Sequence, residues 1–94
     1  MPSLRQLMYF ACVAEYGSIG QAAEVLHVSQ PSLSRQIQAL EVHIGEALFV
    51  RGPAGVSLTE VGRVVHCRAV KIIAEAKALT RDIGDGDDRQ LHIG

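Results

Sequence analysis

Serine and glutamine are frequent in residues 28–40, a stretch that contains one arginine and no acidic residue. Ser29 is a good helix N-cap, and Pro31 would lie in the first turn, where its missing N–H costs nothing. Serine and glutamine at such a helix start offer donors and acceptors to base edges, Arg35 can reach guanine or phosphate, and the helix N-terminus favours phosphate. These residue types indicate contact with double-stranded DNA.

The alternative interpretation of this stretch is an ordinary solvated helix face. Such a face would more often mix glutamate and lysine, so the absence of acid favours a polyanion partner. The overall charge gives little help, because the formal net charge is −1. Residues 1–81 hold eight of the nine basic residues and six of the ten acidic ones, and this excess is only weakly basic.

Capping signals predict two helices before this stretch. Ser3 to Gln6 forms a capping box at the start of the first helix, and Gly17 is expected to end that helix. Residues at helical spacing are expected on the inward face of this first helix, with Phe10 on its flank. They are Leu4, Leu7, Met8, Ala11 and Ala14. A second capping box, Ser18 to Gln21, begins a short helix whose inward residues are Ala22, Ala23 and Leu26.

A tight turn at residues 27–29 joins this short helix to the polar stretch, and two short helices so joined predict a helix-turn-helix. The second of them carries a regular apolar stripe and stops at Gly45. The stripe consists of Leu33, Ile37, Leu40 and Ile44.

Two short strands are expected after Gly45, around a turn signal at residues 52–55. The sequence therefore predicts an all-α fold with a small two-stranded β wing, a winged helix-turn-helix domain over residues 1–58. Within it, the helix-turn-helix occupies about residues 18–38 and the wing about residues 48–58.

Thr59 is expected to cap a long last helix, the linker and dimerisation helix of residues 59–84. Apolar residues recur along it with the alternating three- and four-residue spacing of a heptad seam. A second apolar face carries Val61, Val64 and Ile73, and two apolar faces are best explained by two partners, the helix's own domain and a second copy. Burial within one chain is the alternative. The predicted homodimer interface consists of Val65, Ala69, Ile72, Ala76, Leu79 and Ile83, in a seam that begins at Gly62.

One ordered set of residues covers nearly the whole chain and resembles the LysR-type transcriptional regulators. The set is Leu7, Phe10, Val13, Glu15, Gly17, Ser18, Ala22, Ala23, Leu26, Ser29, Gln30, Pro31, Ser34, Gln36, Ile37, Leu40, Glu41, Gly45, Leu48, Phe49, Arg51, Leu58, Thr59 and Gly62.

The resemblance implies a role for each matching position. In the recognition helix, the residues expected to contact DNA in the major groove are Gln30, Pro31, Ser32, Ser34, Arg35 and Gln36. Ser18 and Ile19 match positions near the phosphates, and Arg51 matches a wing residue at the minor groove. The sequence departs from the family at Ala54, Ser57 and Gln21, where many members carry a basic residue, so Arg51 is expected to be the wing's one charged anchor.

The resemblance extends to the tail. Residues 85–94 are expected to be a hinge and the start of a truncated effector-binding domain, because Leu91 to Gly94 resembles the first strand of the family's ligand-sensing domain. The natural protein would then be about three times longer, would sense a small molecule, and would form a tetramer, whereas this stretch binds no cofactor. An isolated repressor without a sensing domain is the alternative, which the tail disfavours.

Other functions find little support in the sequence. No signal peptide or apolar run of about 18 residues is present, which predicts a cytoplasmic chain that does not enter the membrane.

Cys12 and Cys67 are expected to be buried thiols. No catalytic triad, phosphate loop or metal-ligand spacing is found, so an enzyme is not expected. The histidines are expected at surface or turn positions: His27, His43, His66 and His92. A protein-interaction module is the second hypothesis, and the salt dependence of DNA binding would separate the two.

Overall fold

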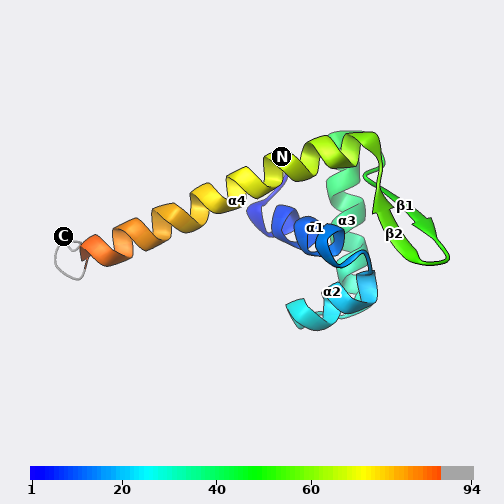
Figure 1. Ribbon diagram of the computed structural model, residues 1–94, viewed down its shortest axis with the longest axis horizontal. Coiled ribbons are helices and arrows are strands. Elements are labelled where there is room, and N and C mark those ends of the chain that lie inside the picture. The colour runs from blue at the N-terminus through cyan, green and yellow to red at the C-terminus, as the bar shows by residue number, and fades with distance from the viewer. Residues whose placement is uncertain (88–94) are drawn as a thin grey trace.

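The computed structural model describes the backbone of residues 1–87 and the side chains of residues 1–81. The expected strand at Leu91 to Gly94 lies outside these residues. Helices and strands follow the predicted order of a winged helix-turn-helix and a long last helix (Figure 1). They are α1 (Leu4–Tyr16), α2 (Ile19–Leu26), α3 (Gln30–Ile44), β1 (Phe49–Gly52), β2 (Gly55–Leu58) and α4 (Glu60–Asp87).

The helix boundaries follow from side chains that satisfy free backbone groups. At the start of α1, Ser3 accepts from the backbone of Gln6 and Gln6 accepts from the backbone of Ser3, so the predicted capping box is complete. Before α2, Ser18 accepts from the backbone N–H of Gln21, which is one half of the second box. Ser29 caps α3 in the same way. The left-handed residues that end the three helices are Gly17, His27 and Gly45.

The core lies around Phe10 of α1, whose ring is fully buried. This ring lies 5.2 Å from the ring of Phe49 and 6.1 Å from that of His66, centroid to centroid. Because α1 contacts α2, α3 and α4, it needs apolar residues on several sides, and the face predicted for it is partly wrong. Leu4 and Met8 are exposed, whereas Phe10 and Val13 belong to the core.

Several hydrogen bonds hold the wing to the helical domain. The Glu41 carboxylate, near the end of α3, accepts from the backbone N–H of Leu48 at 2.8 Å. The backbone N–H of Thr59 donates to the carbonyl of Leu48 at 3.0 Å. The hydroxyl oxygen of Thr59 accepts from the backbone N–H of Gly62 at 2.9 Å, which confirms Thr59 as the cap of α4. At the strand β2, Val56 donates to the carbonyl of Gly17 at 3.1 Å. The wing is therefore fixed relative to α1 and α3.

The first part of α4 packs on its own domain, which corrects part of the predicted dimer seam. Ala69 is 1% exposed and belongs to the core, so it cannot contact a second chain. Gly62 is buried too, because its Cα lies against the carbonyl of Leu48, where a Cβ would collide. Val65 is half-buried and packs against the same core. Val64, which was expected to face the domain, is 61% exposed.

The second part of α4 extends away from the domain, as Figure 1 shows. The helix continues to Asp87, whereas the sequence predicted its end at residue 84 and a hinge from residue 85. Glycine within a helix costs only about 1 kcal/mol relative to alanine, so Gly84 and Gly86 do not by themselves end a long helix.

Candidate nucleic-acid interface

One side of the molecule, opposite α4, combines α2, the first turns of α3 and the tip of the wing (Figure 1). The turn between α2 and α3 is tight because His27 adopts a left-handed conformation with φ 59° and donates its N–H back into α2. The left-handed conformation is uncommon for residues other than glycine. Here the short connection between α2 and α3 imposes it on His27. The turn brings the N-terminus of α3 to this side.

The exposed face of α3 is polar at its start. Gln30, Pro31 and Arg35 are exposed, as their predicted roles require. The other candidates on this helix are half-buried: Ser32, Ser34 and Gln36. Gln38 is exposed one turn beyond Arg35 and was not among the predicted contacts, although its spacing of three from Arg35 would have indicated it.

Gln30 lies close to the start of α2. A Cβ atom on Gly20 would come 3.3 Å from Nε2 of Gln30, which is tighter than an ordinary contact. The absence of a side chain at Gly20 therefore leaves room for the Gln30 amide. On the same turn of α2, the Ser18 hydroxyl caps the helix, and Ile19 is half-buried against the core. Ile19 thus packs mainly within the domain and offers DNA only part of its side chain.

Gln36 faces the start of α1. Its Oε1 accepts a hydrogen bond at 3.3 Å from Nε2 of Gln6, the residue that completes the first capping box. The sequence placed Gln36 among the DNA contacts, and nothing in the sequence pattern indicated this link between residues 30 positions apart.

Arg51 is exposed in the middle of β1, opposite Val56 of β2. It is the one charged residue between Ala47 and Thr59. Beside it, Pro53 and Ala54 form an exposed tip, and Gly55 has φ 126° and lies against the carbonyl of Gly17, where a Cβ would collide. The wing thus presents a single cation from a firmly held loop.

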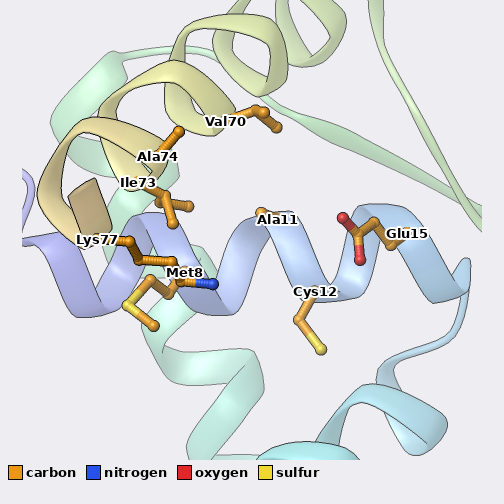
Figure 2. A pocket seen from close by; sticks show the side chains of 8 residues that line it. All are labelled: Met8, Ala11, Cys12, Glu15, Val70, Ile73, Ala74 and Lys77. Carbon is orange, nitrogen blue, oxygen red and sulfur yellow. The ribbon is translucent and has the colours of Figure 1, made fainter. Parts of the chain in front are cut away.

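A second surface lies on the other side of the domain, between α1 and α4. Figure 2 shows this groove, in which Ile73 points toward α1 and Lys77 lies beside Met8. Its remaining lining residues are Ala11, Cys12, Glu15, Val70 and Ala74. A neighbouring hollow along α4 is lined by Leu4, Ala76, Thr80 and Arg81 as well as Met8, Ile73 and Lys77. Both hollows are mainly apolar and are open to solvent.

The described residues also bear on metal binding, on membrane crossing and on the predicted positions of two side chains. No group of three histidine, cysteine or carboxylate side chains within residues 1–81 is placed to hold a metal ion. None of the helices in the described part combines the length and apolar character that a membrane crossing requires. Cys67 is exposed rather than buried, and the ring of His66 is partly buried with its Nε2 enclosed and unpaired, so both predictions were wrong.

The family model for bacterial regulatory helix-turn-helix proteins of the lysR family matches residues 4–63. This chain belongs to the LysR family. The HTH-type transcriptional regulator TfdS of Cupriavidus pinatubonensis is 55% identical to it over 93 residues, which cover 96% of this chain and 32% of that protein. TfdT of the same organism is 49% identical over 78 residues, which cover 83% of this chain and 34% of that protein.

Solved structures of LysR-family DNA complexes share the fold. The complex of the BenM DNA-binding domain with catB site 1 DNA has a TM-score of 0.86 at 36% identity, and the match covers 89% of this chain and 93% of that one. The CbnR DNA-binding domain–DNA complex has a TM-score of 0.80 at 40% identity and covers 93% and 99%. This LysR-family chain spans about a third of the length of the curated relatives it matches.

Proposed function

We propose that this chain is the part of a bacterial transcription regulator that binds double-stranded DNA in a sequence-specific manner. The observation that carries the proposal is the polar, acid-free start of α3, which lies on the same side of the molecule as the wing tip. The relatives named above are transcriptional regulators, and two of the similar structures are DNA complexes, which supports the same function.

In this proposal α3 enters the major groove and the wing lies at the minor groove. Gln30, Ser34 and Arg35 read base edges, and Pro31 packs at the groove surface. Ser32 and Ser18 contact the sugar-phosphate backbone of the DNA, and Ile19 adds an apolar contact beside Ser18. Arg51 supplies one positive charge to the minor groove, whose negative potential attracts arginine.

The second copy of this chain is the proposed occupant of the α1–α4 surface. Ile72 and Leu79 are 48% and 63% exposed on α4, and the neighbouring groove adds Met8 and Ile73. Ala76 is half-buried in the adjoining hollow. Burying this apolar surface would favour dimerisation, since about 25 cal/mol is gained per Å² removed from water. The revised interface keeps Ile72, Ala76 and Leu79, and the predicted contact of Ile83 lies outside the described side chains.

The full-length protein is proposed to be a cytoplasmic regulator, rather than an enzyme, with a separate domain that senses a small-molecule effector. The length of the relatives, about three times that of this chain, provides room for such a domain. A tetramer is proposed for the full-length protein, as the family resemblance implies.

Selection from a pool of duplexes with a randomised central segment tests the function. The chain is expected to enrich an inverted repeat, because a symmetric dimer presents two recognition helices to successive major grooves. Affinity for the enriched duplex should fall steeply as salt concentration rises, since phosphate contacts release counterions. A protein-interaction module would enrich no sequence, and its residual DNA binding would show no preference among duplexes.

A further inference from the structure

Three residues connect the start of α1 to the middle of α3. The backbone N–H of Ser3 donates to Oε1 of Gln6 at 3.2 Å, and Nε2 of Gln6 donates to Oε1 of Gln36 at 3.3 Å. The second bond is part-buried and joins two elements that are far apart in the sequence. Since α3 is the proposed recognition helix, the cap of α1 is connected directly to the element that contacts DNA.

The direction of both bonds follows from the chemistry of the groups. A backbone N–H can only donate, so Gln6 must turn its carbonyl oxygen toward Ser3. The NH₂ group of Gln6 then faces α3, and it can only donate as well. Gln36 must therefore turn its own oxygen toward α1. The NH₂ group of Gln36 is left as the free end of its amide.

The position of Gln36 on α3 decides which part of DNA this NH₂ group meets. One residue corresponds to about 100° around a helix, so Gln36 lies on the flank of α3 next to the exposed Arg35. When the exposed face of a helix meets base edges, its flank meets the groove wall, which is lined by phosphates. A phosphate oxygen accepts hydrogen bonds and cannot donate them, so only the NH₂ end of the Gln36 amide suits it.

We propose that Gln6 is a positioning residue for DNA binding: it holds the Gln36 amide with its oxygen toward α1, so that the NH₂ group donates to a DNA phosphate. This inference rests on the proposed function. It assigns Gln36 to fixing the register of α3 on the duplex rather than to reading adenine, which requires both ends of an amide to face the base.

The variant Gln6→Glu reverses the arrangement without removing the cap. Glutamate completes a capping box as well as glutamine does, so the variant should fold normally. Its carboxylate accepts but does not donate, so Gln36 would turn its NH₂ group toward α1 and its oxygen toward the phosphate. The probe is the duplex enriched by the selection described above, with single phosphates replaced in turn by uncharged methylphosphonates.

The wild-type chain should lose affinity when the phosphate opposite Gln36 is replaced. Gln6→Glu and Gln36→Met should each bind the unmodified duplex about tenfold more weakly, the size of one hydrogen bond to a charged group. Gln6→Glu and Gln36→Met should each be insensitive to replacement of that one phosphate. The double variant Gln6→Met with Gln36→Met carries no added charge and should be no weaker than Gln36→Met alone, because the two residues act as one unit. The neutral variant Gln6→Met should behave in the same way, which separates the effect from the added charge.

Gln38→Met is the matched control, since this glutamine is exposed on the same helix and its effect should add to that of Gln6→Glu. The inference is overturned if Gln6 variants retain the wild-type dependence on every phosphate, or if their effects add fully to that of Gln36→Met. A wild-type chain that enriches no sequence would instead remove the proposed function, and the inference with it. Thermal unfolding of each variant identifies any loss that comes from the fold.

Discussion

Arg35 is the residue whose loss should most directly change sequence preference. It is exposed, and it is the one charged side chain in the first half of α3. Its planar guanidinium can donate two hydrogen bonds to guanine, a contact that discriminates against other bases by about 1–3 kcal/mol. Arg35→Ala is therefore expected to weaken specific binding by about that amount and to remove the preference at one base position of the selected site.

The variant Arg35→Lys keeps the charge but loses the planar pair of donors, so it should retain nonspecific affinity while the base preference weakens. Binding of selected and random duplexes measures the two effects separately. Base preferences and affinity that remain unchanged in Arg35→Ala would exclude Arg35 from reading the sequence.

The two cysteines should differ in their reaction with a soluble thiol reagent. Burial raises the pKa of the Cys12 thiol, and the nearby Glu15 carboxylate raises it further, so less of the reactive thiolate is present near neutral pH. Cys67 is exposed on α4. Cys67 should be modified first at pH 8, and the rate at Cys12 should keep increasing as the pH rises toward its elevated pKa. Peptide mass mapping after short labelling checks the order, which equal rates would contradict.

At the scale of whole elements, the wing is the one that should position the domain without specifying sequence. Its base is tied to Glu41 and Thr59, and its second strand is tied to the carbonyl of Gly17, so the wing and the recognition helix keep a fixed relation. A wing held in this way can direct Arg51 to the DNA without the entropy loss of ordering a loop.

Arg51→Ala is expected to lower affinity for selected and random duplexes alike, because a contact to the minor groove depends on charge rather than on base identity. The dependence of log affinity on log salt should become shallower by roughly one charge. Ser57→Ala, a neutral and exposed position of the same wing, is the control and should leave the slope unchanged. A shift in base preference at constant salt slope would show that Arg51 reads the sequence instead.

The elements themselves could be predicted because their signals are local. Ser3, Ser29 and Thr59 cap helices, and Gly17 and Gly45 end them, as their side chains and backbone freedom predict. The faces of the helices were harder to predict. The α1 helix contacts three others, so the single apolar stripe proposed for it omitted Val13 and included the exposed Met8.

Heptad spacing on α4 was ambiguous for a related reason. An apolar stripe shows that a helix has a partner but does not identify it, and here the first half of the stripe meets the chain's own domain at Gly62 and Ala69. The link from Gln6 to Gln36 has no periodic signal at all, because it depends on how two elements cross in space. Three-dimensional packing was needed to separate these roles.

At the scale of the whole molecule, two domains must be held in a fixed relation to recognise an inverted repeat. The 28 residues of α4 extend about 42 Å at 1.5 Å per residue, which is longer than the roughly 34–36 Å between successive major grooves on one side of DNA. Packing α4 helices against each other could therefore set the spacing of the recognition helices. A dimer that reads two half-sites in place of one would also discriminate better between sites.

Ile72→Glu should separate the dimer while each domain stays folded. Ile72 is 48% exposed, so the substitution leaves the core of the single chain unchanged, whereas in a dimer it would bury a charge within an apolar interface. Sedimentation at tens of micromolar is expected to show a wild-type dimer and a monomeric variant with nearly normal helix content. Val42→Glu on α3, where the valine is 80% exposed, is the matched control and should remain dimeric. A monomeric wild-type chain, or an Ile72→Glu chain that still dimerises, would mean that the apolar surface of α4 has another occupant.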